Sequence, residues 1–482
     1  MTAADIGQRL NEVIDGLNAR GIDARLIGSG GDEVTVDHVG IDSRQCRMGE
    51  LFACISGRHH DGHDHAREAV AAGAIALLVE RPLDLEVPQI LVPCTRAAVG
   101  PIASALHGEP STKTTVIGIT GTNGKTTVAS MVAAVLESSG SPATVIGTLS
   151  GRLTTPEAPD LQRMIREAAD AGRAVVMEVS SHALVEHRVD GITFAVGAFT
   201  NLGRDHLDLH GSMEDYFRAK ASLFTVGCPA TSVINIGDTH GRLLADTLTG
   251  SEGTELRTVS IDDVHGLELA PTGSTFVLGD QRWSIPLVGR PHVENAIVAR
   301  GICQALGVDD ERIAVGLNSM KPVPGRLEFV TDGDGDIDVV VDFAHTPDAL
   351  DAVIETCREL GPGRRIVVVV GCGGNRDIAK RPEMGRAAST ADRVILTSDN
   401  PRAEDPVAIV EAMLSGVPDS AREKTSVVVD RRDAIVSAIQ NSSSGDLIVI
   451  AGRGHETVQE IAGQLIEFDD REVARGALGV QR

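Results

Sequence analysis

The sequence lacks any apolar run that approaches the roughly 20 residues with which a helix crosses a bilayer. Its first residues, MTAADIGQRLNEVIDGL, carry acids where a secretory signal peptide carries bases. Basic residues are scarce, since 44 lysines and arginines stand against 68 acids, for a formal net charge of -24. Such a charge repels nucleic acid and anionic membrane surfaces. We therefore expect a cytoplasmic protein with no nucleic-acid partner and no integral membrane contact.

The chain also lacks paired cysteines. Its seven cysteines, at positions 46, 54, 94, 228, 303, 357 and 372, show no CxxC spacing. Neither a disulfide framework nor a thiolate zinc site is indicated. The segment HHDGHDH (59–65) matches no standard zinc spacing, so we interpret it as a solvated turn leading into a helix over 63–72 and assign it no catalytic metal.

The length of 482 residues exceeds what one hydrophobic core usually serves, and three domains are the natural division. No internal repeat is present, which excludes a solenoid. Two stretches rich in proline and glycine, HGEPSTK (107–113) and MKPVPGR (320–326), are typical of linkers. We predict domains at 1–110, 111–321 and 322–482.

The middle segment predicts an α/β domain. Residues 114–147 consist of an apolar run, a glycine-rich turn, a helix and a second apolar run. Apolar residues recur in that helix at i, i+3, i+4, i+7 and i+8, from Val128 to Leu136, and form one stripe that packs on a sheet. The runs AVVMEV (174–179) and FAVGAFT (194–200) predict parallel strands covered on both faces.

The last segment predicts a Rossmann-like, doubly wound α/β domain. Its apolar runs alternate mostly with helical stretches, and four of them end in polar residues: VVDFAH, VVVGCGGNR, LTSDNPR and VIAGRGHE. Ligands of such sheets collect beyond the carboxyl ends of the strands. We expect these four ends to face one crevice.

The glycines at 118, 121 and 124 predict a phosphate-binding loop between a strand and a helix. Lys125 adds a point charge, and the Thr126 hydroxyl is expected on a magnesium ion that bridges the outer phosphates. The loop is a variant, because GxxxxGK[ST] would require glycine at position 119, where isoleucine stands. A plain glycine turn is the alternative, and the flanking strand and helix disfavour it.

Acidic and histidine residues at two further strand ends are candidate metal ligands. Glu178 follows a buried apolar run, where a carboxylate needs a bound partner. His206 and Asp208 follow the next run and are expected to approach the same edge. For a histidine taken singly, a structural role in a capped turn is the alternative.

Eight motifs, in order, give the chain a resemblance over essentially its whole length to the Mur ligases, enzymes that add amino acids to the peptide stem of cell-wall precursors. The motifs are DSR (42–44), TGTNGKTT (120–127), TTP (154–156), EVSSH (178–182), NLGRDHLD (201–208), YFRAKASLF (216–224), PGRLE (324–328) and GRGHE (452–456). The resemblance implies an N-terminal domain for the UDP end of the substrate, a central P-loop-type ATPase with a parallel sheet, and a C-terminal domain for the incoming amino acid.

The resemblance also implies a reaction in peptidoglycan precursor synthesis. ATP would drive the addition of meso-diaminopimelate to UDP-MurNAc-L-Ala-D-Glu through an acyl phosphate, with magnesium at two sites. We expect a monomer. A Mur-like or folylpolyglutamate-type ligase that uses a different amine, and a non-catalytic paralogue that binds a UDP-sugar peptide, are the alternatives.

Site residues follow from the same resemblance. Lys125, Glu178, His206 and Lys220 are expected to be catalytic, and Thr126, Glu178, His206 and Lys220 to hold metal. ATP is expected at Gly121, Thr122, Asn123, Gly124, Lys125, Thr126, Thr127, His292, Asn295, Arg326 and Asp342. The UDP-sugar peptide is expected at Ser43, Thr154, Thr155, Ser180, Glu186 and Arg188, and diaminopimelate at Arg376, Asp399, Asn400, Pro401, Arg402, Gly452 and Glu456.

Lys220 and Arg402 carry the most specific of these expectations. Lys220 matches a lysine that the family carries as a carbamate, an anion that divalent ions stabilise; an exposed helix lysine is the alternative. Arg402 ends the sequence DNPR, as in the family's diaminopimelate-adding members, and its guanidinium can grip a distal carboxylate with two hydrogen bonds. Several positions depart from the family pattern. Among them, Glu186 stands where a neutral residue suits an anionic substrate better, Asn375 stands where aspartate is frequent, and the segment from Gly147 to Thr154 is shorter than in relatives.

Overall fold

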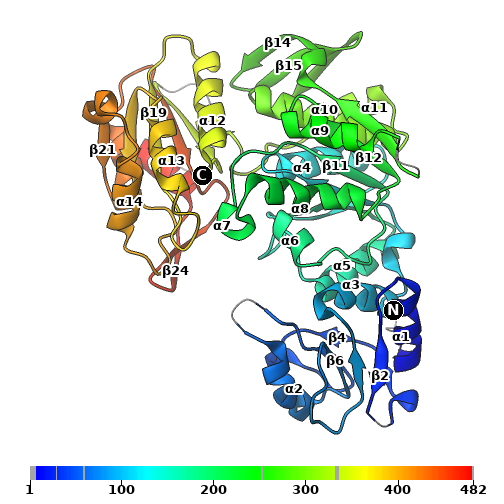
Figure 1. Ribbon diagram of the computed structural model, residues 1–482. Helices are drawn as coiled ribbons and strands as arrows, with labels where there is room; N and C mark the ends of the chain where they lie inside the picture. Colours follow the sequence, from blue (N-terminus) through cyan, green and yellow to red (C-terminus); the bar gives the residue numbers. More distant parts are fainter. Residues whose placement is uncertain (1–6, 29, 58–59, 251–252, 332–335, 480–482) are drawn as a thin grey trace.

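The computed structural model describes residues 7–28, 30–57, 60–250, 253–331 and 336–479. Three sheet-centred units follow one another along the chain, with the first below the second and the third beside the second in Figure 1. Among the described residues, no helix is long and apolar enough to span a membrane.

The first unit is a five-stranded sheet in which only one edge strand is antiparallel. Its order is β2 (Arg25–Ile27), β7 (Gln89–Leu91), β6 (Ala76–Val79), β5 (Leu51–Ala53) and β4 (Val39–Gly40), with β2 antiparallel to β7. Apolar residues of α1 (Leu10–Ala19) and α3 (Thr95–Leu106) share one core with the sheet. A second core includes Ala66 and Ala69 of α2 (Ala66–Ala72).

The segment 59–65 corrects one prediction, although His59 lies outside the described residues. The chain forms a 3-10 turn, η3 (Gly62–His65), and the α-helix begins only at Ala66. His63 is buried rather than solvated: its Nδ1 lies 2.6 Å from Asp61 Oδ1, and its Nε2 accepts the N–H of Glu80 at 3.0 Å. This histidine is therefore part of the local structure.

The second unit is built on six parallel strands. Their order is β13 (Glu255–Val259), β12 (Thr231–Asn235), β11 (Val196–Phe199), β8 (Val116–Thr120), β10 (Ala174–Glu178) and β9 (Ala143–Ile146). One face packs on α4 (Lys125–Ser138), α10 (Arg290–Ala305) and α11 (Asp310–Ser319), the other on α5 (Ala158–Asp170), α8 (Met213–Thr225) and α9 (Thr239–Leu248). The predicted parallel sheet, covered on both faces, is confirmed.

A small antiparallel sheet in the same unit was not predicted. Strands β14 (Val264–Ala270), β15 (Gly273–Leu278) and β16 (Gln281–Ile285) form a meander. Phe276, Trp283 and Ile285 bury its inner face in the core that α10 and α11 share. It thereby covers the helix that carries His292 and Asn295.

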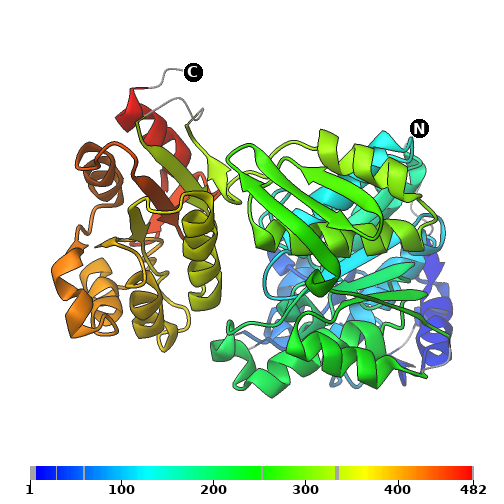
Figure 2. The ribbon, with the colours of Figure 1, turned by 90° about the horizontal axis from the view of Figure 1, so that it is seen from above.

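The third unit confirms the predicted doubly wound fold. Its order is β17 (Glu328–Phe329), β18 (Asp338–Asp342), β22 (Leu447–Ala451), β19 (Ile366–Val370), β20 (Arg393–Leu396) and β21 (Thr425–Val427), parallel apart from β17. Helices α12 (Pro347–Leu360), α13 (Lys380–Ala388) and α14 (Pro406–Leu414) cover one face, and α15 (Arg431–Gln440) and α16 (Asp470–Leu478) the other. Figure 2 shows this unit beside the second one, seen from above.

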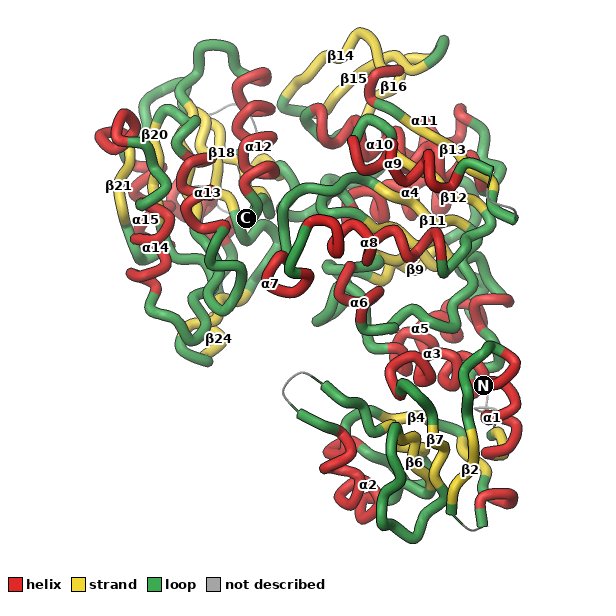
Figure 3. The backbone as a smooth tube through the Cα atoms, viewed as in Figure 1, coloured by secondary structure: helices red, strands yellow, loops and turns green. Residues whose placement is uncertain are grey.

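The loops after several parallel strands of the second and third units meet between them. In Figure 3 these loops, drawn green, lie near α7 (Leu207–His210), where the two units approach. The carboxyl ends of parallel strands point the same way, so each sheet presents a row of loops at one edge. The candidate site lies where the two rows face each other.

Candidate active site

A cavity of about 310 Å³ lies between the second and third units. Its walls combine residues predicted for three different ligands. The predicted residues that line it are Thr122, Asn123, Gly124, Lys125, Thr126, Thr127, Thr154, Glu178, Ser180, His206, Asp208, Arg326, Arg376, Asp399, Asn400, Arg402, Gly452 and Glu456.

The glycine-rich loop has the backbone of an anion cradle. Gly121 has φ 148°, and a Cβ there would lie 1.8 Å from Thr200 Oγ1. Gly124 has φ 88°, and a Cβ there would lie 2.2 Å from Asn295 Oδ1. Only glycine tolerates both the conformation and the close approach. Helix α4 begins at Lys125, so its first N–H groups and its positive dipole end border the cavity, as a phosphate requires.

Two lysines reach this loop from different helices, Lys125 half-buried and Lys220 buried. Lys125 Nζ donates to the carbonyls of Gly121 and Thr122, both at 2.8 Å. Lys220, on α8, donates to the Gly121 carbonyl at 2.8 Å and lies 4.5 Å from the Tyr216 ring centre. Burial, and then the charge of Lys125, hold the pKa of Lys220 well below its usual value. Lys220 is 1% exposed, so the alternative of an exposed helix lysine is wrong.

Glu178 ends β10 and is 1% exposed. The Thr126 hydroxyl lies 3.0 Å from both of its carboxylate oxygens, and Thr148 donates its N–H to Oε1 at 2.8 Å. Arg326 Nη2 lies 3.2 Å from the same Thr126 hydroxyl. Oxygen ligands of this kind suit Mg²⁺, which takes the rest of its shell from phosphate and water. Within the described part of the chain, no group of three or more His, Cys, Asp or Glu side chains could hold a metal by itself.

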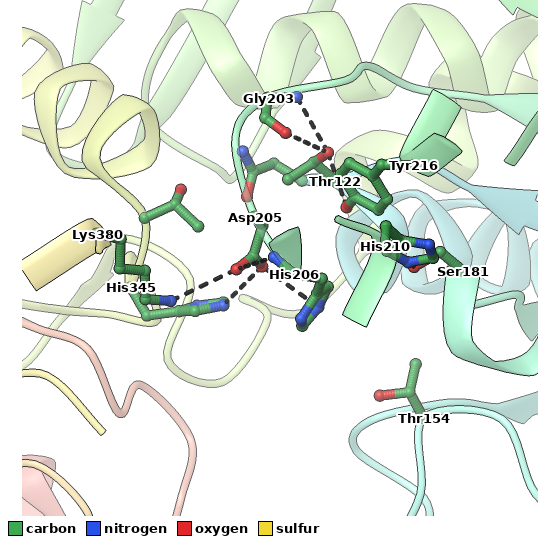
Figure 4. A network of polar contacts seen from close by, with 12 residues as sticks. Thr122, Thr154, Ser181, Gly203, Asp205, His206, His210, Tyr216, His345 and Lys380 are labelled. Atoms are coloured by element: carbon green, nitrogen blue, oxygen red, sulfur yellow. Dashed lines mark hydrogen bonds and ion pairs between the residues drawn. The ribbon is translucent and has the colours of Figure 1, made fainter. Parts of the chain in front are cut away.

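Asp205 joins the second and third units, a contact that the sequence did not predict. His206 Nε2 lies 3.3 Å from Asp205 Oδ2, and His345 Nε2 lies 3.4 Å from the same oxygen. Lys380 Nζ lies 3.4 Å from Asp205 Oδ1 (Figure 4). Burial alone raises the pKa of Asp205, but the hydrogen bond and charge of His345 and the charge of Lys380 hold it well below the usual value. The motif VVDFAH had pointed to His345 as a strand-end residue, but Lys380 gave no signal.

His206 stays neutral at physiological pH, because burial lowers its pKa to about 3. Its ring lies edge-on to that of His182, with 4.8 Å between centres. His210 Nε2 lies 2.9 Å from Ser181 Oγ, and its ring centre is 4.9 Å from that of Tyr216. A neutral imidazole is the form that ligates metal. These ring and hydroxyl contacts pack the segments EVSSH (178–182) and RDHLDLH (204–210) together, beside the helix α8 that carries Lys220 (Figure 4).

The opposite wall of the cavity carries charges of both signs. Asn400 Nδ2 donates to Glu456 Oε2 at 2.8 Å, and burial, then the charge of Asp399, raise the pKa of Glu456. Arg402, with φ 53°, donates to the Gly374 carbonyl at 2.6 Å. Acids beside an arginine suit a zwitterionic ligand, whose ammonium and carboxylate both need partners.

The residues predicted for the UDP-sugar peptide lie in two places. Thr155 Oγ1 donates to the Glu178 carbonyl at 2.8 Å and accepts the N–H of Ser180 at 3.0 Å. Arg188 Nη1 donates to the Thr155 carbonyl at 3.2 Å. Ser43 is remote in the fold: it begins η2 (Ser43–Gln45) in the first unit and does not line the cavity.

The remaining predicted nucleotide residues come from α10 and from the first part of the third unit. Asn295 faces Gly124, and His292, one turn earlier on α10, is 5% exposed with its pKa lowered to about 4, chiefly by burial. The Arg326 guanidinium lies 4.4 Å from the Phe343 ring centre. Asp342 accepts the N–H groups of residues 327 and 344, both at 2.7 Å.

Comparisons with known proteins find family models that match successive parts of this chain. The Mur ligase family, catalytic domain model matches residues 35–119, the Mur ligase middle domain model 119–303, and the Mur ligase, glutamate ligase domain model 325–454. UDP-N-acetylmuramoyl-L-alanyl-D-glutamate--2,6-diaminopimelate ligase of Bacillus licheniformis is 40% identical over 93% of this chain and 96% of its own length. The same enzyme of Geobacillus thermodenitrificans is 41% identical over 92% and 94%. A solved structure of this ligase, 32% identical, covers 94% of this chain and 96% of its own, with a TM-score of 0.66.

Proposed function

This chain belongs to the Mur ligase family, and we propose that it uses ATP to add meso-diaminopimelate to UDP-MurNAc-L-Ala-D-Glu in peptidoglycan precursor synthesis. One observation carries the proposal: the glycine-rich loop and the DNPR segment line the same cavity from two different sheets. The relatives' names supply the substrates, since each is a 2,6-diaminopimelate ligase.

The domain roles belong to the proposal. Residues 1–110 would bind the UDP end of the substrate, 111–321 ATP, and 322–482 the amino acid. The sugar and peptide would be held by Thr154, Thr155, Ser180 and Arg188, and the diaminopimelate by Arg376, Asp399, Asn400, Pro401, Arg402, Gly452 and Glu456.

The reaction proceeds in two displacements. The glutamyl carboxylate attacks the γ-phosphorus of ATP, the bond to ADP breaks, and an acyl phosphate forms. The free amine of diaminopimelate then attacks the acyl carbon, a C–N bond forms, and inorganic phosphate leaves. Lys125 and the N-terminus of α4 border the cavity where negative charge develops, so they stabilise the transition state electrostatically.

Magnesium fits the oxygens of Thr126 and Glu178, and when bound it spreads the charge of the transferred phosphoryl group. His206 and Lys220 complete the proposed ligand set. The lowered pKa of the Lys220 amine supports a carbamate there, because only a neutral amine attacks CO₂. The two oxygens of the carbamate, rather than the nitrogen of Lys220, would then bind the metal.

Phosphate release in the presence of ATP, magnesium and the UDP-sugar dipeptide tests the function. We expect release with diaminopimelate and little with lysine or ornithine, because these lack the distal carboxylate that Arg402 requires. With the amine omitted, hydroxylamine should trap the acyl group as a hydroxamate. Turnover with lysine equal to that with diaminopimelate would refute the substrate assignment, and no turnover with any amine would favour a non-catalytic binding protein.

A further inference from the structure

Arg96 connects the first unit to the substrate-binding segment of the second. Its Nη2 lies 3.0 Å from Glu186 Oε2, and its Nη1 donates to Glu157 Oε2 at 2.7 Å. Glu157 Oε1 in turn lies 3.0 Å from Arg188 Nη2. These four side chains alternate in charge and are each between 16% and 28% exposed.

The backbone fixes this contact. A Cβ on Gly100, in the same helix α3 as Arg96, would lie 2.2 Å from the carbonyl oxygen of Asp190. A Cβ on Gly191 would lie 2.9 Å from the carbonyl oxygen of Gly100. Helix α3 therefore packs backbone to backbone on the turn just after Arg188, which holds the backbone of Arg96 close to that turn.

Glu186 explains why the proposed substrate site needs the ion pair with Arg96. It ends the short helix α6 (Ser181–Val185) as its C-cap, two residues before Arg188. The nucleotide-sugar peptide carries phosphates and carboxylates, and an unpaired carboxylate beside its binding residues would repel it. The Nε of Arg188 is buried and has no hydrogen-bond partner among the described residues.

We propose that Arg96 is a positioning residue for the nucleotide-sugar peptide: by pairing with Glu186 and Glu157 it cancels an acid that this chain carries beside Arg188. The inference rests on the proposed function, because it assumes an anionic substrate at Arg188. With Arg96 present the four charges sum to zero, and without it an unbalanced negative charge remains next to the substrate.

A double-mutant cycle tests this role. We expect Arg96→Gln to raise the KM for the UDP-sugar dipeptide by about tenfold, through repulsion from the freed carboxylates, while the KM for ATP stays unchanged. Glu186→Gln alone should lower the dipeptide KM, because it removes a negative charge beside the anionic substrate. In Arg96→Gln/Glu186→Gln most of the increase should disappear, a rescue that a purely structural role of Arg96 does not predict. Arg20→Gln, which breaks an exposed arginine–glutamate pair in the same unit, is the matched control.

The outcomes separate this inference from the function on which it rests. An active wild-type enzyme whose dipeptide KM is unchanged by Arg96→Gln, or whose double variant is as impaired as Arg96→Gln alone, overturns the inference only. Wild-type protein inactive with every amine overturns the proposed function. If melting curves show that Arg96→Gln does not fold, Glu186→Gln decides: a dipeptide KM that does not fall in that variant contradicts the inference.

Discussion

Lys125 and Lys220 converge on one backbone oxygen, since each Nζ lies 2.8 Å from the carbonyl of Gly121. Two ammonium groups so placed would repel each other, and burial lowers the pKa of both. Lys125 has a second carbonyl acceptor, and the charge of Glu178 favours its protonated form. The arrangement therefore suits one ammonium, on Lys125, and one neutral amine, on Lys220.

Replacing Lys220 by alanine should lower kcat by at least about a hundredfold, because a ligand for the phosphoryl-bound metal is lost. Acetate or propionate should restore part of the activity, since a small carboxylate can occupy the space of the lost carbamate. Phosphate release measures both effects. Lys113→Ala, at an exposed lysine, is the control. Full activity of Lys220→Ala would exclude a catalytic carbamate.

Replacing Arg402 by lysine should raise the KM for diaminopimelate by about tenfold or more, because a bidentate contact becomes a single one. The KM for ATP should change little, since Arg402 lies on the wall that the third unit supplies. Initial rates with each substrate varied in turn give both constants. Arg422→Lys, at an exposed arginine, controls for the substitution itself. Equal increases in both KM values would contradict the assignment.

The parallel strands and the phosphate loop were predictable because their signals are local. Strands such as β19 and β22 are buried on both faces and appear as continuous apolar runs. The glycines at 121 and 124 stand between a strand end and a helix start, where a tight turn is recognisable in the sequence, although the contacts that require them come from Thr200 and Asn295. The β14–β16 meander, by contrast, has only exposed and half-exposed residues on β14, and its apolar side is recognisable only against α10 and α11.

Contacts between units were not predictable, because they depend on how the units approach. Asp205 is separated from Lys380 by 175 positions, and Arg96 from Glu186 by 90, so no spacing in the sequence indicates either pair. Glu178 was identified because a carboxylate after a buried strand is costly without a partner. The partner proved to be the hydroxyl of Thr126, with Thr148 adding a backbone N–H that gave no sequence signal.

Replacing Lys380 by methionine should weaken the contact between the second and third units at Asp205. The chemistry needs both walls of the cavity together, so we expect kcat to fall by about tenfold with little change in melting temperature. Small-angle scattering with and without ATP should show a more open average arrangement than in the wild type. Lys321→Met, at an exposed lysine, is the control. Wild-type kcat and scattering in Lys380→Met would show that the contact is dispensable.

Replacing Asp470 by asparagine should destabilise the third unit by about 3–5 kcal/mol, because it leaves a buried guanidinium without its counter-ion. Arg431 donates from Nε and Nη2 to the two carboxylate oxygens at 2.8 and 2.7 Å, and both side chains are fully buried. Chemical denaturation measures the loss. Asp419→Asn breaks the exposed pair with Arg422 and should cost less than about 1 kcal/mol. Equal losses of unfolding free energy in the two variants would mean that burial of the ion pair does not determine how much its removal destabilises the protein.

The buried His292 should make the protein sensitive to acid. Its pKa is lowered to about 4 from a usual 6.5, so between these values the unfolded chain binds a proton that the folded one excludes. The stability that the neutral ring contributes is complete above pH 6.5 and is lost as the pH falls toward 4, by about 3 kcal/mol. In His292→Gln the denaturation midpoint should therefore fall less between pH 7 and pH 4.5 than in the wild type. His265→Gln, at an exposed histidine, should keep the wild-type pH dependence; the same dependence in His292→Gln would show that this ring does not control the acid sensitivity.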